Sequence, residues 1–339
     1  NCNKIRFFGN LNMKVLVTGG AGNIGLSIVK ILEKMNIQSV IFDLSEQIKI
    51  NQDFISSSAE VIPGSILDKS LISQALKGCT HVIHLAAVLG VKNTETNNLN
   101  CLEINIQGTE NLLSAAISEK IEKFIFTSSS EVYGEPLELP ISESSITQGK
   151  TLYAVSKLAG EEFVKGYAQR YPFLNYSILR LFNSFGPYQV GQFVVQKFIQ
   201  NAIQGKPLII NGDGEQKRGF CYVDDTAEGI VAALISEKAN SEVINIGNDN
   251  DSNFVSIIEL ARMVLRMLNI AEEGNIIFNK DFEDENTDRN SSREIFQRYP
   301  DVSKARSLLN FEPKVSLEDA IGRVIETGNF IEDWAVTKD

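Results

Sequence analysis

A tyrosine and a lysine four residues apart form the pair of side chains best suited to proton transfer. The segment Tyr153-Ala-Val-Ser-Lys157 lies in a stretch rich in Ala, Lys and Glu, so the phenol and the ammonium share one face of the expected helix. A phenol has a reference pKa of about 10, and a nearby ammonium favours its ionised form. Tyr153 can then take a proton from a hydroxyl near neutral pH. The same spacing also occurs in ordinary amphipathic helices.

A run of hydroxyl side chains precedes this helix. The segment Thr127-Ser-Ser-Ser-Glu-Val-Tyr-Gly134 directly follows an expected strand that ends near Thr127. In a doubly wound sheet, ligands bind beyond the carboxyl ends of the strands. These hydroxyls therefore lie where we expect a substrate, and they can donate to an oxyanion. The alternative is a serine-rich surface loop.

A glycine-rich turn near the start of the chain predicts a dinucleotide site. The turn reads Thr18-Gly-Gly-Ala-Gly-Asn-Ile-Gly25, and it follows a strand and opens a helix. Glycines there permit a sharp turn and close approach of a pyrophosphate to the helix amino end. Asp43 follows 18 residues after Gly25, where a carboxylate binds ribose hydroxyls and repels a 2′-phosphate. NAD is favoured over NADP, the alternative being a structural turn and a solvated acid.

The first half of the chain alternates short apolar strands with helical patterns. This alternation is typical of a parallel sheet with helices on both faces, because parallel strands need crossover connections. We expect strands at Lys14–Thr18, Ser39–Phe42, Val61–Ile62, His81–Leu85, Lys123–Thr127 and Tyr176–Leu181. We expect helices at Ile24–Leu32, Leu71–Leu76, Ile104–Ile117 and Leu152–Tyr171.

The second half differs in texture, since Gly and Pro become frequent and the elements shorten. Helices are expected near Ile257–Leu268 and Leu317–Thr327, and a polar loop at Asn279–Arg293. The sequence thus predicts an α/β fold, a Rossmann-type doubly wound parallel sheet with a smaller C-terminal α/β substrate lobe. Its expected divisions are an N-terminal extension over 1–12, an NAD-binding Rossmann domain over 13–182, and the substrate lobe over 183–339, with some segments returning to the sheet.

Composition excludes several kinds of partner. The net charge of -11 and the pI near 4.9 argue against nucleic acid and anionic membranes, which need clustered Lys and Arg. The sequence contains no apolar run of about 18 to 20 residues, the length that spans a bilayer. Its four cysteines form no C-x-x-C pair, so we expect no zinc site or disulfide framework and a cytoplasmic location. His81 and His84 lie on an expected buried strand and are interpreted as structural, with no metal site predicted.

Taken together, these motifs resemble the extended short-chain dehydrogenase/reductases of the nucleotide-sugar epimerase/dehydratase family. The resemblance covers Met13 to about Phe330. Besides the segments above, it includes His84-Leu-Ala-Ala87, Asn105-Ile-Gln-Gly-Thr109, Arg180-Leu-Phe-Asn-Ser-Phe-Gly-Pro187, Gly212-Asp-Gly214 and Tyr222-Val-Asp-Asp225. It implies tightly held NAD, a nucleotide-sugar substrate, most often a UDP-sugar, and a homodimer formed through the helices near 104–117 and 152–170.

The resemblance also implies roles for individual residues. Ser129, Tyr153 and Lys157 correspond to a catalytic triad, and Ser130 and Glu131 correspond to further catalytic positions. Substrate contacts are implied for Ser129, Asn183, Val194, Phe198 and Arg218. Cofactor contacts are implied for Gly19, Gly22, Asn23, Ile24, Gly25, Asp43, Ser65, Ile66, Leu85, Ala86, Ala87, Asn105, Tyr153 and Lys157. This chain departs from many relatives at Ser65, where an Asp is common, and at Tyr188, where an Arg is common.

The resemblance leaves three reaction outcomes open after oxidation of the sugar at C4. The Asp-Glu pair of one dehydratase group is replaced by Ser130-Glu131, which also resembles UDP-glucuronate decarboxylases and GDP-mannose dehydratases. The segments Phe220–Asp225 and Gln297–Asp301 favour a decarboxylase, whereas Tyr153–Glu161 looks more like 4-epimerases. We predict an NAD-dependent nucleotide-sugar 4-epimerase, with a UDP-glucuronate decarboxylase or a 4,6-dehydratase as alternatives. A non-catalytic dinucleotide-binding scaffold or sensor is the alternative of another class.

Overall fold

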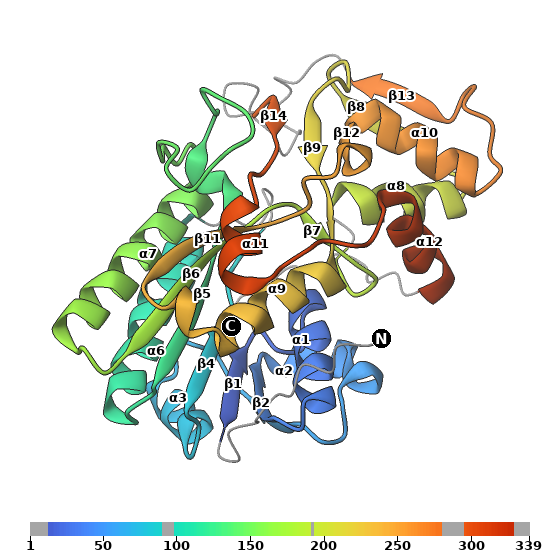
Figure 1. The fold of residues 1–339 in the computed structure, drawn as a ribbon. Helices are drawn as coiled ribbons and strands as arrows, with labels where there is room; N and C mark the ends of the chain where they lie inside the picture. The colour runs from blue at the N-terminus through green and yellow to red at the C-terminus, as the bar shows by residue number, and fades with distance from the viewer. Residues whose placement is uncertain (1–12, 90–97, 191–192, 280–294, 329–339) are drawn as a thin grey trace, which may run out of the picture.

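The structure is a computed structural model that describes residues 13–89, 98–190, 193–279 and 295–328. The expected N-terminal extension, 1–12, and nearly all of the expected polar loop, Asn279–Arg293, lie outside these ranges. Figure 1 shows the arrangement of the described elements.

A seven-stranded parallel sheet forms the centre of the molecule, in the order β11-β6-β5-β4-β1-β2-β3. β1 lies between β2 and β4, so the strand order reverses there, as in dinucleotide-binding folds. This arrangement confirms the predicted doubly wound fold class. The strands are β1 (Lys14–Thr18), β2 (Gln38–Asp43), β3 (Glu60–Pro63), β4 (His81–His84), β5 (Lys123–Ser129), β6 (Asn175–Leu181) and β11 (Glu242–Ile246).

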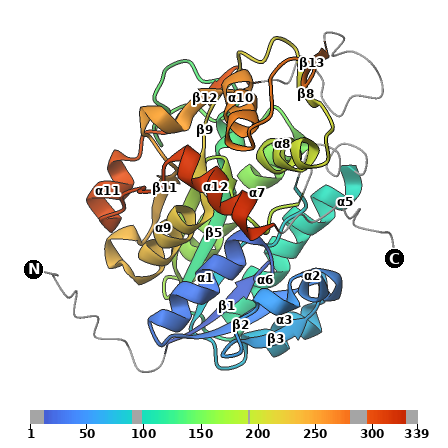
Figure 2. The same cartoon turned by 90° about the vertical axis from the view of Figure 1, so that its right-hand side faces the viewer.

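Helices cover both faces of the sheet, because its strands are apolar on both sides. Val15 and Val17 of β1 belong to one buried cluster and Leu16 to another, as expected when successive side chains point to opposite faces. The first face carries α1 (Asn23–Lys34), α9 (Val223–Ile235) and α11 (Ser303–Leu309). The second face carries α3 (Lys69–Leu76), α6 (Gly108–Ser118) and α7 (Leu152–Arg170). Figure 2 shows α1 and α3 on opposite sides of the sheet.

Element boundaries differ from the predicted ones at a few positions. The expected helix Ile104–Ile117 begins as a π-helical turn, Glu103–Gln107, and continues as α6. Two short helices lie outside the predicted ranges. α2 (Ser45–Ile50) follows β2, and α5 (Asn98–Leu102) directly precedes the π-helical turn. α3 begins two residues earlier than expected, because the Asp68 side chain accepts from the Ser70 and Leu71 amides and caps the helix,.

The second half of the chain builds a separate apolar core beside the sheet. This core joins α8 (Val194–Ile203), α10 (Ile257–Met267) and α12 (Leu317–Thr327), which lie together at the upper right of Figure 1. Small sheets accompany them, made of β7 (Ser184–Phe185) with β10 (Cys221–Tyr222), β8 (Leu208–Asn211) with β13 (Ile276–Asn279), and β12 (Phe254–Ser256) with β9 (Lys217–Gly219) and β14 (Gln297–Arg298). β11, α9 and α11 return to the large sheet.

Within the described ranges, no helix combines the length and the apolar character that crossing a membrane requires. Likewise, these ranges contain no group of three or more His, Cys, Asp or Glu residues placed to hold a metal ion. Both ring nitrogens of His84 contact threonine hydroxyls, Nδ1 with Thr18 at 2.7 Å and Nε2 with Thr109 at 2.9 Å. His84 therefore joins β4 to β1 and α6.

Candidate active site

The glycine-rich turn between β1 and α1 leaves no room for side chains. A Cβ at Gly25 would lie 2.5 Å from the Gly19 carbonyl oxygen, and one at Gly19 would lie 2.8 Å from the Ala86 nitrogen. Gly19 also has a φ of 69°, which glycine adopts without strain. Gly22 is the N-cap of α1, so the first helical N–H groups point toward the open end of the turn, where an anion binds favourably.

Asp43 lies at the end of β2 beside this turn. Its carboxylate accepts from the Ala21 amide at 3.0 Å and the Leu44 amide at 2.8 Å. Burial raises the pKa of Asp43 to about 6, and these two backbone donors oppose the rise. A carboxylate that is fixed by backbone donors next to a glycine-lined helix end fits an adenosine ribose followed by a pyrophosphate. The turn and Asp43 therefore fit NAD.

The other expected cofactor residues surround the same end of the sheet. Leu85, Ala86 and Ala87 follow β4 and are partly exposed, and the Leu85 and Ala86 amides donate to Thr18. Ile66 packs beneath Gly108 of α6, and Ser65 Oγ accepts from the Leu67 amide within its own loop.

Asn105 acts through its neighbours in this part of the fold. Its buried amide group accepts from the Val88 amide at 2.8 Å and donates to the Val88 carbonyl at 3.0 Å. It also donates to Ser156 Oγ at 3.0 Å. Asn105 therefore joins the loop after β4 to α7.

Tyr153, Lys157 and Ser129 meet where β5 ends and α7 begins. Ser129 ends β5, and its hydroxyl is close enough to Tyr153 to lower the pKa of the phenol. Lys157 Nζ donates to the Thr127 carbonyl at 2.9 Å and lies 5.7 Å from the centre of the Tyr153 ring. Thr151 caps α7 by accepting from the Ala154 amide, which places Tyr153 in the first turn. The structure thus brings these three predicted residues together.

The ionisation of this cluster reflects its burial. Burial raises the pKa of Tyr153 well above its ordinary value, the nearby Glu131 charge raises it further, and the Ser129 hydroxyl lowers it. Burial also lowers the pKa of Lys157 to about 8. A positive charge brought close to Tyr153 would favour its phenolate.

Glu131 extends the cluster toward the second lobe. Its Oε2 accepts from Thr151 Oγ1 at 3.3 Å, and its Oε1 lies 3.8 Å from Arg298 Nη1. Arg298 is 8% exposed and lowers the pKa of Tyr153. Ser130, which precedes Glu131, is also buried, with 1% of its surface exposed. Sequence reasoning missed Arg298 as a site residue, although the Gln297–Asp301 segment that contains it was a signal.

The expected substrate residues of the second lobe lie on separate elements. Asn183 has a φ of 30°, and its side-chain Nδ2 donates to the Gly219 carbonyl at 3.2 Å. Arg218 and Arg298 are register partners on the parallel strands β9 and β14, so their side chains project from the same face of that small sheet.

The last two predicted substrate residues belong to α8. Val194, at its start, is partly exposed, whereas Phe198 is 2% exposed and packs into the lobe core. A nucleoside contact from Phe198 stays a prediction.

Tyr188, a departure from many relatives, lies against the cofactor helix. Its amide donates to Asn23 Oδ1 at 3.1 Å, and its ring centre is 4.5 Å from that of Phe54. Lys30 of α1 lies over the same ring at 5.2 Å. Tyr188 therefore joins the substrate lobe to the first turns of α1.

Comparison with known proteins identifies the family. The model of the NAD dependent epimerase/dehydratase family matches residues 15–247. The chain belongs to this family. This match confirms three predictions: the family, an NAD-dependent enzyme, and NAD as the cofactor.

Relatives within the epimerase/dehydratase family carry three different activities in their names. A UDP-N-acetyl-alpha-D-glucosaminuronate decarboxylase of Bacillus cytotoxicus is 34% identical, over 95% of this chain and 100% of that protein. A human dTDP-D-glucose 4,6-dehydratase is 32% identical, over 94% and 90%. The structure of a Bacillus cereus UDP-glucuronic acid 4-epimerase with UDP-glucuronic acid and NAD has a TM-score of 0.82 and 32% identity, over 93% and 98%. The chain is thus an NAD-dependent nucleotide-sugar epimerase, decarboxylase or dehydratase.

Proposed function

We propose that this enzyme oxidises a UDP-linked hexuronic acid at sugar C4 and that the sugar then loses its carboxyl group as carbon dioxide. The contact between Arg298 and Glu131 beside Tyr153 carries this proposal. A guanidinium presents five N–H donors in a planar fork that matches a carboxylate. Arg218, on the same face of the small sheet, offers a similar fork to the diphosphate,.

The NAD site follows from the turn, Asp43 and the Tyr153–Lys157 pair. When bound there, NAD supplies reversible acceptance of a hydride from sugar C4. Tyr153 takes the proton of the C4 hydroxyl, and the Ser129 hydroxyl favours the phenolate by lowering the pKa of Tyr153. Lys157, fixed by the Thr127 carbonyl, supplies a positive charge that favours the phenolate.

Loss of carbon dioxide from the resulting 4-keto sugar follows from its own chemistry. The carboxylate on C5 is β to the C4 ketone, so the bond between C5 and the carboxyl carbon breaks and its electron pair moves to the C4 oxygen. Hydroxyl donors on Ser129 and Tyr153 can stabilise that oxyanion. C5 then takes a proton, for which Glu131 is the proposed donor. The hydride held by the bound cofactor would return to C4, and Tyr153 would return its proton to the C4 oxygen, which restores the hydroxyl.

The second candidate is the 4-epimerase that sequence analysis favoured. The Tyr153–Glu161 segment supports it, and so does the similarity to a structure of a UDP-glucuronic acid 4-epimerase. In that case Arg298 would hold the carboxylate of the 4-keto sugar without its loss. A 4,6-dehydratase is less well supported. Ser130 is buried, and its side chain carries no carboxylic acid that could protonate the departing 6-hydroxyl.

Product analysis tests this proposal directly. Purified enzyme is incubated with UDP-glucuronate, UDP-N-acetylglucosaminuronate, UDP-glucose and UDP-N-acetylglucosamine, and the products are followed by NMR and carbon dioxide capture. We expect a UDP-pentose and carbon dioxide from a uronate. Retention of all carbon with inversion at C4 would establish the epimerase instead, and a 4-keto-6-deoxy sugar would exclude both. Tyr153→Phe serves as the blank.

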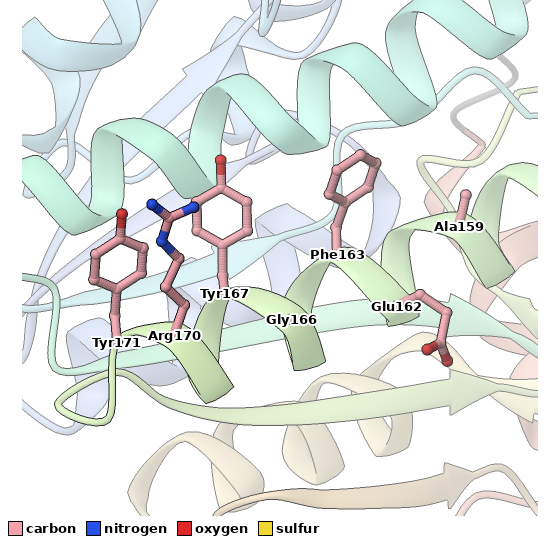
Figure 3. A pocket seen from close by; sticks show the side chains of 7 residues that line it. All are labelled: Ala159, Glu162, Phe163, Gly166, Tyr167, Arg170 and Tyr171. Atoms are coloured by element: carbon pink, nitrogen blue, oxygen red, sulfur yellow. The ribbon is translucent and has the colours of Figure 1, made fainter.

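We also propose that the enzyme is a homodimer formed through α7. A groove of about 580 Å³ runs along this helix and is lined by Ala159, Glu162, Phe163, Gly166, Tyr167, Arg170 and Tyr171. Figure 3 shows the three aromatic rings in a row on one side of the helix. A second copy related by a twofold axis would place Glu162 of one chain near Arg170 of the other, and such self-complementary faces are typical of dimers.

A further inference from the structure

A buried ion pair joins α7 to strand β6 next to the redox site. Arg180 Nε donates to Glu161 Oε1 at 2.9 Å, and Arg180 Nη2 donates to Glu161 Oε2 at 2.7 Å. The Arg180 and Glu161 side chains are 7% and 1% exposed. Two parallel hydrogen bonds between planar groups fix their relative orientation as well as their distance. The pair therefore specifies where this part of α7 lies on the sheet.

The carboxylate of Glu161 also binds the strand that carries Ser129. Ser128 Oγ donates to Glu161 Oε1 at 2.6 Å. Ser128 and Arg180 are register partners on the parallel strands β5 and β6, so both side chains leave the sheet on the same face. Glu161 thus contacts both strands at one level of the sheet, one residue before Ser129.

Tyr153, Lys157 and Glu161 follow one another at four-residue intervals along α7. This spacing places them on one side of the helix. Lys157 donates to the Thr127 carbonyl and Glu161 accepts from the Ser128 hydroxyl, so two turns of α7 contact two adjacent residues of β5. The next residue of β5, Ser129, lowers the pKa of Tyr153.

Gly160 shows how closely α7 approaches β5. A Cβ at this position would lie 2.3 Å from Cζ of the Phe126 ring, a distance that side chains do not tolerate. Because the helix has so little space above the strand, a change in the Glu161 contacts would alter its height or rotation. Such a change would reach Tyr153 two turns away.

We propose that Glu161, Arg180 and Ser128 are positioning residues that hold α7 on the end of β5 and so set the separation between the Tyr153 and Ser129 hydroxyls. The inference rests on the proposed oxidation at C4, in which those hydroxyls take part. The positioning residues act through Tyr153, Lys157 and Ser129. A misplacement of about 1 Å can lower a rate about 100-fold, so loosening this contact lowers kcat more than it changes KM.

The charge of Glu161 also acts on Lys157. Burial lowers the pKa of Lys157, and Cys101 and, to a smaller extent, the negative charge of Glu161 raise it in part. Loss of that charge would let the ammonium deprotonate at lower pH. The alkaline limb of the kcat profile in Glu161→Gln should accordingly move to lower pH, an effect that a loss of packing alone does not produce.

Two pairs of matched variants test the inference. Ser128→Ala removes the hydroxyl that contacts Glu161, and Ser177→Ala, its control, removes a buried β6 hydroxyl that donates to the Ala239 carbonyl at 2.7 Å. Arg180→Lys removes the paired donors, and its control, Arg306→Lys, removes another pair of donors from a carboxylate, that of Asp249 at 2.6 and 2.7 Å. We expect kcat to fall about tenfold in Ser128→Ala and about 100-fold in Arg180→Lys, with KM within about twofold.

Kinetics, thermal unfolding and hydrogen exchange are measured on the full chain with NAD bound. Both controls should retain wild-type kcat even where their melting temperatures fall. Wild-type kcat in folded Ser128→Ala and Arg180→Lys, or an equal loss in the controls, would overturn the positioning role. Wild-type enzyme that converts no nucleotide sugar would overturn the proposed function. Amide exchange in the first turns of α7 then decides positioning separately, since Ser128→Ala should accelerate it and Ser177→Ala should not.

Discussion

Arg298 Nη1 lies 3.8 Å from Glu131 Oε1, although the two residues come from distant parts of the chain. Glu131 lies in the short helical turn that follows β5, whereas Arg298 lies on a small sheet of the second lobe. Their approach closes one side of the redox site with a buried cation. A carboxylate on the sugar is the substrate feature that such a cation would recognise.

Replacement of Arg298 by Met should lower activity on a uronate selectively. Met keeps much of the side-chain length but offers no N–H donor, so kcat/KM for the UDP-uronate should fall about tenfold to 100-fold, or about 1.4 to 2.8 kcal/mol. Steady-state kinetics with a UDP-uronate and the matching UDP-hexose measure this selectivity. An equal loss with both sugars would contradict carboxylate recognition. Arg306→Met, remote from the site, is the control.

Removal of the Tyr153 hydroxyl should abolish most turnover without releasing the cofactor. In Tyr153→Phe we expect kcat to fall by about 10² to 10⁴, the usual contribution of a positioned acid or base. NAD affinity should stay near the wild-type value, which calorimetry can check. Tyr167→Phe, on the same helix, removes a hydroxyl that donates to Glu110 at 2.7 Å and should retain kcat. Similar losses in both variants would contradict a specific role for Tyr153.

Activity should decline as the pH rises through about 8. The pKa of Lys157 is lowered to about 8 by burial, so its ammonium is present below this pH and is lost above it. Because that charge favours the Tyr153 phenolate, its loss slows proton removal. A kcat profile in buffers of constant ionic strength measures the limb. Lys157→Arg should move any remaining limb to higher pH, and an unchanged limb would show that another group titrates.

NAD affinity should decrease as the pH falls through about 6. Burial raises the pKa of Asp43 to about 6, so its carboxylate, the proposed acceptor for the ribose hydroxyls, is present above this pH and protonated below it. Asp43→Asn should weaken NAD binding about tenfold, or about 1.4 kcal/mol, and flatten the pH dependence. Calorimetric titrations on either side of pH 6 test both effects. Asp53→Asn, an exposed change nearby, should leave the wild-type pH dependence intact.

A charge placed in the α7 groove should separate the proposed dimer. A Cβ at Gly166 meets no described atom within 4 Å, so Gly166→Glu fits the isolated chain while filling the groove. Analytical ultracentrifugation should detect a dimer for the wild type and a monomer for the variant. Gly322→Glu is the control, since Gly322 also lies in a helix and a Cβ there would meet only Met267 Cε, at an ordinary contact distance of 3.5 Å. A monomeric wild type would exclude the dimer.

Most of the strands and helices could be predicted, because each is indicated by a pattern of apolar residues within its own segment. Lys14–Thr18 and Leu317–Thr327 were expected with the bounds that β1 and α12 have. The π-helical turn at Glu103–Gln107 was not predicted. Helical periodicity continues through it, and Asn105 within the turn bonds the loop after β4 and α7, contacts that join residues distant in the chain.

The cofactor turn and the Tyr153–Lys157 pair could be predicted from the order of residues alone. Both depend on spacing within one element or one turn, where neighbours in the chain are neighbours in space. The contact of Arg298 with Glu131 and the contacts of Glu161 with Ser128 and Arg180 became visible only in the folded chain. These contacts join residues that are far apart in the chain. The packing of the two lobes, and of α7 on two adjacent strands, brings them close together. The expected reaction changed for that reason, from epimerisation to decarboxylation of a uronate.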